Sequence, residues 1–459
     1  MLPALPPFLA VYYHFSVCGS RSDTVHAVTL ITHEPIAAAM AGPAIRVAEM
    51  ARVLSESLRV RVASPYPVER DLGSVDARRY RFGDDDSLRA AIDGSDVVVV
   101  QGFTLEKFPF LAASSTCLVV DLYCPFQLEN LERRRCVEPS SQIRAHDAAV
   151  DLAVLQRQLR RGDYFLCASE RQRDYWLGML SAAGRLNPAT YEPDRMLRAL
   201  IDVVPFGLPE RPATRTGPGF KGRVRGIDGD DRIIIWGGSV LDWHDALTPI
   251  RAMTRVIDDV PGARLVFPVG SHPSPELPTL SMLDGARQLA RELGLLDRHV
   301  FFTDWMPYDD RVNYLLEAEI GLSAHQVSLE TRFAWRTRIL DYIWVGLPIV
   351  CNDGDSMADL VASRGLGFTP PSGDVEAMAT ALLTLLQDPD AAATCRRHVE
   401  PLRPSLTWTR VVEPLRAYCE RASRAPDTGG TATAPQGPPR ARRSVPRRLA
   451  AALKRLVNR

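Results

Sequence analysis

Four charged side chains stand close together in the stretch ETRFAWRTRILDYIWVGLPIV, residues 330–350. Glu330, Arg332, Arg336 and Arg338 fall within nine positions, directly before an apolar pattern typical of a buried helix that runs into a strand. A guanidinium group is planar, always charged and suited to bidentate contact with carboxylates and phosphates. The stretch therefore predicts either an anion-binding site or a solvated, salt-bridged helix start.

Two glycine-bearing turns elsewhere in the chain could also approach an anion. Gly42, in AAMAGPAIR, follows a β-rich run and opens a helical pattern, whose free N–H groups could bind an anion. Arg46 lies about one helical turn further on. The alternative is that Gly42 only permits a tight turn and that Arg46 is a surface residue. Gly237 and Gly238 follow another β-rich run, where glycine allows the backbone to come close to a ligand.

These residues must be positioned by strands and helices that alternate along the chain. Short β-rich runs such as VVVVQG (97–102) and RIIIWGG (232–238) are separated by longer helical stretches. Strands that are apolar along their whole length and separated by helices indicate parallel sheets covered on both faces. The alternation stops at residues 211–230, which are rich in Pro, Gly and charge, and then starts again. The sequence therefore predicts two α/β domains.

The predicted organisation has six segments. They are a leader (1–26), an N-terminal Rossmann-like domain (27–210), a linker or hinge (211–230), a second Rossmann-like domain (231–400), a crossing helix (401–423), and a low-complexity linker with a basic tail (424–459).

The last twenty residues, 440–459, carry eight basic groups and no acidic one. They form a short amphipathic helical pattern, with Leu449, Leu453, Leu456 and Val457 on one face. This pattern predicts contact with an anionic membrane surface, and the alternative is a solvated tail.

Composition limits the classes of partner. Among 459 residues, 55 basic and 55 acidic groups cancel, so no overall field favours nucleic acid. The eight cysteines show no zinc-ligand spacing, and several lie in apolar runs, so we expect reduced thiols and no metal site. No apolar run reaches the roughly 18 to 20 residues that span a bilayer. The leader has three prolines and no basic start, which argues against a signal peptide. A cytoplasmic protein is expected.

Three local motifs, in order along the chain, resemble the group 1 (family 4) glycosyltransferases. They are GPAIR (42–46), VPFGLP (204–209) and DYIWVGLPIVCNDGDSMADLV (341–361). ETRFAWRTRILDY (330–342) and SERQRDYWLG (169–178) are similar to the subset associated with surface polysaccharide synthesis. The resemblance covers about residues 27–423. It implies the GT-B architecture: two Rossmann-like domains facing a central cleft, with a C-terminal helix returning to the first domain.

The resemblance also implies an activity. The expected enzyme is a retaining, metal-independent transferase of the hexosyltransferase type, which moves a sugar from a nucleotide sugar to a glycan, lipid-linked or small-molecule acceptor. The first domain would hold the acceptor and the second the donor nucleotide. A role in cell-surface polysaccharide or glycoconjugate synthesis follows, at the inner face of the plasma membrane if the basic tail binds lipid. No cofactor is expected beyond the donor substrate.

The donor's pyrophosphate needs positive charge around it, because negative charge grows there during transfer. Relatives usually place an arginine and a lysine shortly after the first strand of the second domain, whereas here no basic residue lies between Gly238 and Arg251. We therefore expect at least one of Arg332 and Arg336 to contact the pyrophosphate. Arg338 is expected to point elsewhere.

Two acidic residues correspond to the paired glutamates of the family. Glu330 corresponds to the first, which in relatives contacts the transferred sugar. A second glutamate is expected eight positions later, where this chain has Arg338. Asp341 instead lies five residues before Gly346, and the resemblance implies that it accepts hydrogen bonds from the ribose hydroxyls.

The remaining site candidates come from strand ends. Trp305 and Met306, in FFTDWMPYDD, lie where relatives hold the nucleobase. Asp121 ends the run CLVVD, at a carboxyl edge where open α/β sheets bind ligands, and it is our candidate for orienting the acceptor hydroxyl or the sugar.

Other functions remain open at this stage. A sugar-nucleotide epimerase would share the architecture and turn over without an acceptor. A non-catalytic partner subunit of the same fold would bind nucleotide weakly and transfer nothing. A nicotinamide oxidoreductase is disfavoured, because no strand is followed by G-x-G-x-x-G with an acidic residue downstream.

Overall fold

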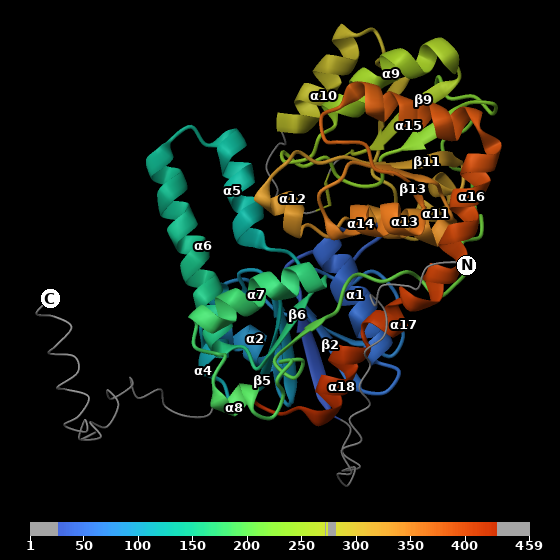
Figure 1. Ribbon diagram of the computed structural model, residues 1–459. Helices are drawn as coiled ribbons and strands as arrows, with labels where there is room; N and C mark the ends of the chain where they lie inside the picture. Colours follow the sequence, from blue (N-terminus) through green and yellow to red (C-terminus); the bar gives the residue numbers. More distant parts are fainter. Residues whose placement is uncertain (1–25, 271, 274–280, 429–459) are drawn as a thin grey trace, which may run out of the picture.

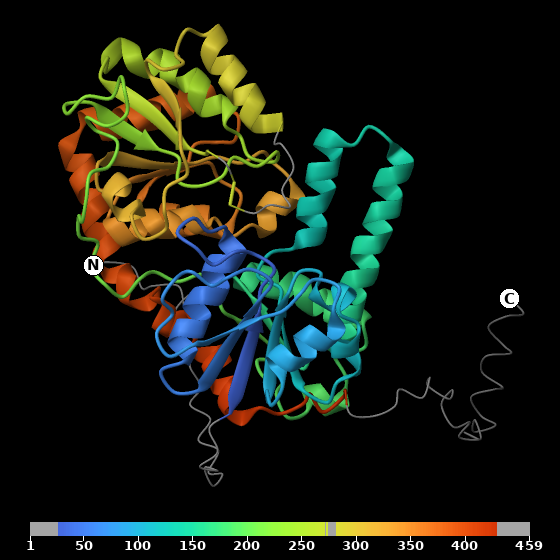
Figure 2. The same cartoon turned by 180° about the vertical axis from the view of Figure 1, so that it is seen from behind.

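The computed structural model describes residues 26–270, 272–273 and 281–428. The predictions for the leader and for the tail at 440–459 fall almost entirely outside these residues. Figure 1 shows two α/β domains, the first in blue to green and the second in yellow to orange. Figure 2 shows the same two domains from behind.

The first domain is built on a sheet of seven parallel strands in the order β3-β2-β1-β4-β5-β6-β7. The strands are β1 (Ala27–Ile31), β2 (Arg59–Ser64), β3 (Asp76–Arg79), β4 (Val97–Gln101), β5 (Cys117–Asp121), β6 (Tyr164–Cys167) and β7 (Ile201–Val203). The central strands β1, β4, β5 and β6 are buried along their whole length, as their apolar sequences require.

Helices cover both faces of this sheet. They are α1 (Gly42–Leu54), α2 (Asp85–Ile92), α3 (Thr104–Lys107), α4 (Phe110–Ala113), α5 (Phe126–Val137), α6 (Ser141–Arg161), α7 (Glu170–Ala182) and α8 (Pro188–Tyr191).

The second domain repeats the architecture with six parallel strands in the order β10-β9-β8-β11-β12-β13. The strands are β8 (Arg232–Ile235), β9 (Ala263–Pro268), β10 (Val300–Thr303), β11 (Ala318–Ser323), β12 (Ile349–Cys351) and β13 (Gly367–Phe368). The helices are α9 (Leu247–Asp259), α10 (Ser281–Glu292), α11 (Arg311–Leu315), α12 (Leu329–Phe333), α13 (Thr337–Val345), α14 (Ser356–Arg364), α15 (Val375–Gln387) and α16 (Pro389–Val399). In Figure 1, α12, α13 and α14 lie on the side that faces the first domain.

The segment 211–230, expected as a linker or hinge, is bound to the second domain at residues 219–221. Its Gly219, Phe220 and Lys221 donate backbone N–H groups to the carboxylate of Glu317, and Phe220 is fully buried. A Cβ on Gly219 would meet Glu317 Oε2 at 2.5 Å, so the chain passes too close for any other residue. These contacts fix residues 219–221 to the second domain.

After α16 the chain returns to the first domain, as the fold prediction required. The expected single helix over 401–423 is instead three short pieces: a 3-10 helix (Glu400–Ser405), α17 (Trp408–Val411) and α18 (Glu413–Arg421). Pro404 and Pro414 account for the breaks, since proline cannot donate a backbone hydrogen bond. Tyr418 stacks on Tyr164 of β6 at 4.4 Å between ring centroids, which anchors the end of the chain.

Two long helices of the first domain were not foreseen from the sequence. Helices α5 and α6 form a hairpin that stands away from the sheet and alongside the second domain (Figures 1 and 2). Its α5 contacts α12 of the second domain. Within the described residues, no helix, this pair included, is long and apolar enough to cross a membrane.

Candidate functional site

Glu330 lies buried where the two domains meet. It belongs to the short helix α12, whose start is capped by Ser328 Oγ accepting the Thr331 N–H at 3.1 Å. Only 3% of Glu330 is exposed. This burial raises the pKa of Glu330 to about 8, and the charge of Glu129 on α5 adds to the rise. Glu330 therefore keeps its proton at neutral pH and can donate as well as accept a hydrogen bond.

Glu129 is the first-domain counterpart of Glu330. Burial raises the pKa of Glu129 to about 7, so this carboxyl is only partly ionised at neutral pH. The charge of Glu129, in the first domain, thus disfavours the charged form of Glu330 across the α5–α12 contact. No motif marked Glu129, because a hairpin inserted between two strands brings it here.

Arg336 is committed to a buried ion pair. It stands at the N-cap position of α13, and its guanidinium pairs with Asp355, with both side chains fully buried. It also donates to Asn352 Oδ1 at 3.1 Å and to the Ser323 carbonyl at 3.3 Å. Asp355 in turn caps α14 by accepting two backbone N–H groups. A contact between Arg336 and a donor stays a prediction, and the observed contacts of Arg336 join the ends of β11 and β12 to the start of α14.

The other two arginines of the stretch differ from each other. Arg332 is exposed, and its backbone carbonyl accepts a bond from Arg171 of the first domain. Arg338 is half-buried in the first turn of α13, where its guanidinium lies 4.6 Å from the centre of the Trp236 ring. Its Nη2 donates to the Ser239 carbonyl at 3.0 Å. Arg338 therefore points away from the partners of Arg336, as expected, and faces the turn that follows β8.

That turn contains Gly237 and Gly238. The Gly237 N–H donates to the hydroxyl of Tyr342 at 2.8 Å, which ties the turn to α13. Gly238 has a φ of +93°, and a Cβ there would meet no atom within 4 Å. Glycine is thus required by the backbone conformation, and the space beside the turn is open.

Two histidines lie next to the turn. His244 and His325 stack with ring centroids 4.5 Å apart, and both are buried. Burial lowers the pKa of both rings well below the usual value, and Arg336 and Arg338 add to the shift. Both imidazoles are therefore neutral at physiological pH.

On the first domain, Gly42 begins α1, as expected, but Arg46 and Asp121 bind each other. Arg46 Nε and Nη2 donate to the Asp121 carboxylate at 2.6 Å and 2.9 Å, with both side chains fully buried. Gln101 donates to the same carboxylate at 3.1 Å. The pair joins α1 to the end of β5. A role for Arg46 in donor binding, or for Asp121 in catalysis, stays a prediction.

The comparisons with known proteins agree with this arrangement. The family model described as "Glycosyl transferases group 1" matches residues 231–388. These residues are a group 1 glycosyltransferase domain. No curated protein sequence matches the chain significantly.

Solved structures of similar architecture cover both domains. Sucrose-phosphate synthase from Thermosynechococcus elongatus superposes with a TM-score of 0.61 at 14% identity, over 86% of this chain and 98% of that one. HepE from Anabaena, in complex with UDP-glucose, superposes with a TM-score of 0.60 at 14% identity, over 86% of this chain and 100% of that one. WaaG, a glycosyltransferase involved in lipopolysaccharide biosynthesis, superposes with a TM-score of 0.58 at 13% identity, over 85% of this chain and 99% of that one. At this level of identity the likeness establishes the fold, which is GT-B as predicted.

Within the group 1 glycosyltransferase domain, the expected nucleobase residues follow β10 and the expected ribose residue lies in the middle of α13. Trp305 and Met306 follow β10, and Trp305 contacts the ring of His272 edge to face at 5.1 Å. Asp341 pairs with Arg311 at 3.0 Å and is 35% exposed on its side chain, so one face of the carboxylate is accessible. The roles assigned to these three residues stay predictions.

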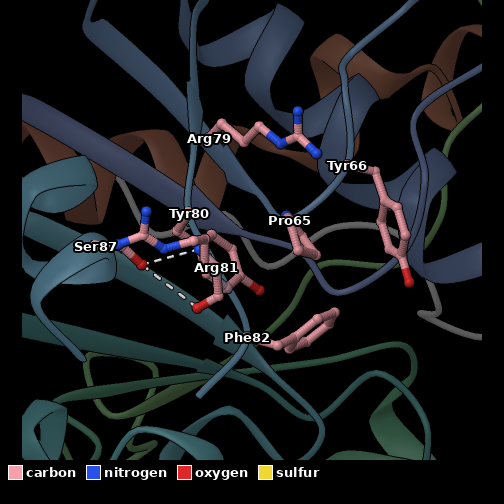
Figure 3. A pocket seen from close by; sticks show the side chains of 7 residues that line it. All are labelled: Pro65, Tyr66, Arg79, Tyr80, Arg81, Phe82 and Ser87. Carbon is pink, nitrogen blue, oxygen red and sulfur yellow. Dashed lines mark hydrogen bonds between the residues drawn. The ribbon is translucent and has the colours of Figure 1, made fainter. Parts of the chain in front are cut away.

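A hollow of about 500 Å³ lies on the first domain, at the ends of β2 and β3. Figure 3 shows its lining side chains, which are Pro65, Tyr66, Arg79, Tyr80, Arg81, Phe82 and Ser87. Phe82 is 41% exposed, and Arg81 is held by Asp84 and by a backbone bond to Ser87 Oγ at 2.9 Å. Sequence motifs did not indicate this hollow, because its residues come from two separate segments, 65–66 and 79–87, that match no family motif.

Proposed function

We propose that this protein is a retaining glycosyltransferase that moves a sugar from a nucleoside diphosphate sugar to a glycan, lipid-linked or small-molecule acceptor. The proposal includes independence from metal ions, a hexosyl group as the sugar moved, and a role in cell-surface polysaccharide or glycoconjugate synthesis. The group 1 glycosyltransferase domain and the GT-B fold support the reaction class.

One observation supports the proposal most directly. Glu330 is the acidic residue of the donor domain that is buried against the first domain and remains protonated at neutral pH. A neutral carboxyl there can donate a hydrogen bond to a sugar hydroxyl without repelling a negatively charged donor. We propose that Glu330 contacts the transferred sugar and orients its anomeric carbon.

In the proposed retaining step, the leaving phosphate takes the proton of the acceptor hydroxyl on the same face of the sugar. The new glycosidic bond forms as the bond to the phosphate breaks, and the nucleoside diphosphate leaves with the proton. No strong protein base is then required. The first domain would bind the acceptor, and the hollow at Tyr66 and Phe82 offers aromatic surface and guanidinium groups suited to a saccharide.

The experiment is a transfer screen across nucleoside diphosphate sugars, each with and without lipid-linked acceptors and with EDTA in a parallel set. We expect acceptor-dependent release of nucleoside diphosphate that EDTA does not reduce. Turnover of the donor sugar without any acceptor would instead support an epimerase. Nucleotide binding with no turnover would support a non-catalytic subunit.

Kinetics of variants test the role of Glu330. We expect Glu330→Ala to lower kcat much more than it raises the donor KM, because the contact acts on the reacting sugar. For the wild type, kcat/KM should fall as pH rises through about 8, the pKa of Glu330. Glu330→Gln should lack this alkaline limb. If kcat/KM of Glu330→Gln still fell as pH rises through about 8, Glu330 would not be the group that contacts the transferred sugar in its protonated form.

A further inference from the structure

The turn after β8 lacks a nearby cation in the sequence. No basic residue lies between Gly238 and Arg251. Gly237, Gly238 and Ser239 are nevertheless partly exposed, and the side of Gly238 on which a Cβ would stand is open. A cation for this turn must therefore come from elsewhere in the fold.

Arg338 supplies that cation from α13. Its guanidinium lies over the Trp236 ring and donates to the Ser239 carbonyl, so the charge is held against the turn. Among the described residues no carboxylate pairs with it. Arg336, two positions earlier, is paired with Asp355 in contrast. The charge of Arg336 is thus balanced by Asp355, whereas no carboxylate of the described residues balances the charge of Arg338.

Two buried polar atoms beside the turn also lack a partner in the described structure. They are Nη1 of Arg338 and Nδ1 of His325, a residue only 4% exposed. A buried guanidinium without a counter-ion is costly, because desolvation is not offset by any opposite charge. Burial accordingly lowers the pKa of Arg338 to about 10. An anion at the turn would offset this cost and give both atoms a partner.

We propose that Arg338, the Gly237–Ser239 turn and His325 form an anion site that takes the diphosphate group of the donor. The inference rests on the proposed function for the identity of the ligand, while the anion site itself rests on the uncompensated charge. Arg338 occupies the position where an acidic residue was expected, so it converts part of a ribose-type site into a phosphate-type site. Arg332 and Arg336 are not needed for this contact.

The test uses the full-length protein and inorganic pyrophosphate, which carries no base or sugar. We expect pyrophosphate to raise the melting temperature of the wild type, because a ligand that binds only the folded state stabilises it. Arg338→Met should weaken pyrophosphate binding about 10- to 100-fold, the range for a lost charge-assisted contact. Arg251→Met, at an exposed arginine of α9, is the matched control and should respond like the wild type.

A structural role for Arg338 would give a different result. An uncompensated charge predicts that ligand-free Arg338→Met melts at the same temperature as the wild type or higher. A lower melting temperature without ligand would overturn the proposal. So would a wild type that does not respond to pyrophosphate, or an Arg338→Met that responds equally. Arg338→Lys, which keeps the charge, should retain part of the response.

Nucleotides separate this inference from the proposed function. The panel contains UDP, GDP, ADP, CDP and TDP together with the matching nucleosides. Arg338→Met should weaken the binding of the nucleoside diphosphates and leave the binding of the nucleosides unchanged. If the pyrophosphate response depends on Arg338 while no sugar transfer is found, the anion site stands and the proposed function fails. If transfer proceeds in Arg338→Met with an unchanged donor KM, the inference fails and the function stands.

Discussion

At the scale of single residues, burial decides what the charged groups of the site can do. The three arginines of the 330–338 stretch have the same chemistry, yet Arg332 is exposed, Arg336 is paired with Asp355, and Arg338 lies unpaired against a glycine turn. Of Arg336 and Arg338, whose guanidinium groups both lie inside the fold, Arg338 is the one without a carboxylate partner among the described residues. The two acids that meet between the domains, Glu129 and Glu330, are instead held towards their neutral forms.

The raised pKa of Glu330 makes stability depend on pH. The unfolded chain loses this proton near the ordinary glutamate value of 4.5, whereas the folded protein keeps it until about 8. The folded state therefore binds more protons over this window, and stability falls as pH rises from about 5 to 8. In urea unfolding at pH 5.5, 6.5, 7.5 and 8.5, Glu330→Gln should gain free energy of unfolding relative to the wild type as pH rises. The control variant Glu192→Gln, at an exposed glutamate, should show no such gain in the free energy of unfolding as pH rises. Equal pH dependence of all three proteins would contradict this reasoning.

The Arg336–Asp355 pair gives a second prediction. Arg336→Met leaves Asp355 charged and buried, which typically costs about 3–5 kcal/mol of unfolding free energy. The double variant Arg336→Met/Asp355→Asn removes both charges and should recover much of that loss. Chemical denaturation of the two single variants and the double variant measures the coupling. Strictly additive losses would show that the pair does not act as a unit.

At the scale of elements, helix α13 organises the second domain. Its Tyr342 hydroxyl accepts the Gly237 N–H at 2.8 Å and lies 2.8 Å from the Leu322 carbonyl, so one side chain joins α13 to the ends of two strands. The ring also crosses β11 so closely that a Cβ on Gly321 would meet it at 2.3 Å. The helix that carries Arg338 is thereby fixed relative to the turn that Arg338 contacts.

Removal of the Tyr342 hydroxyl tests this arrangement. Tyr342→Phe leaves the Gly237 N–H without its partner, and we expect a loss of about 1–3 kcal/mol in the free energy of unfolding. Tyr191→Phe, at an exposed tyrosine, is the control and should change stability very little. Denaturation curves with equal slopes give the comparison. A neutral Tyr342→Phe would mean that the turn is held by other contacts.

At the scale of the whole molecule, the two domains and the end of the chain are joined by specific ion pairs. Arg70 of the first domain contacts Glu49 and reaches Asp309 of the second domain at 3.0 Å. Residues 425–428 dock on the first domain, where Asp427 pairs with the buried Arg185 at 2.8 Å. The linker expected to start at 424 therefore begins with a docked segment.

Because residues 425–428 are docked, a deletion that tests the basic tail alone should begin after residue 428. We expect deletion of 429–459 to leave the melting temperature unchanged, whereas deletion of 425–459 should lower it, because Arg185 then loses its carboxylate partner. With the shorter deletion, sedimentation with anionic phosphatidylserine vesicles should fall, since the eight basic groups of 440–459 supply the attraction. Equal sedimentation of the deleted and full-length proteins would discard membrane contact through the tail.

Much of the architecture followed from the sequence because it is encoded locally. Apolar runs such as VVVVQ and CLVVD became buried parallel strands, and the break near 211–230 separated two α/β units. Glu330 was identified from its correspondence to the first of the family's paired glutamates, and it is buried at the domain interface. The residues of α5 and α6, by contrast, have no clear apolar period, so the hairpin that brings Glu129 to Glu330 was missed.

The sequence by itself determined the fold class, since hydrophobic period and turn residues act over a few neighbouring positions. The tertiary structure alone decided which charges are paired, since an ion pair depends on segments far apart in the chain. Arg46 pairs with Asp121, which is 75 positions away in the chain, and Arg336 pairs with Asp355, beyond the next strand. Arg338 lies beside the Gly237–Gly238 turn with no carboxylate partner among the described residues, and no spacing in the sequence could show that.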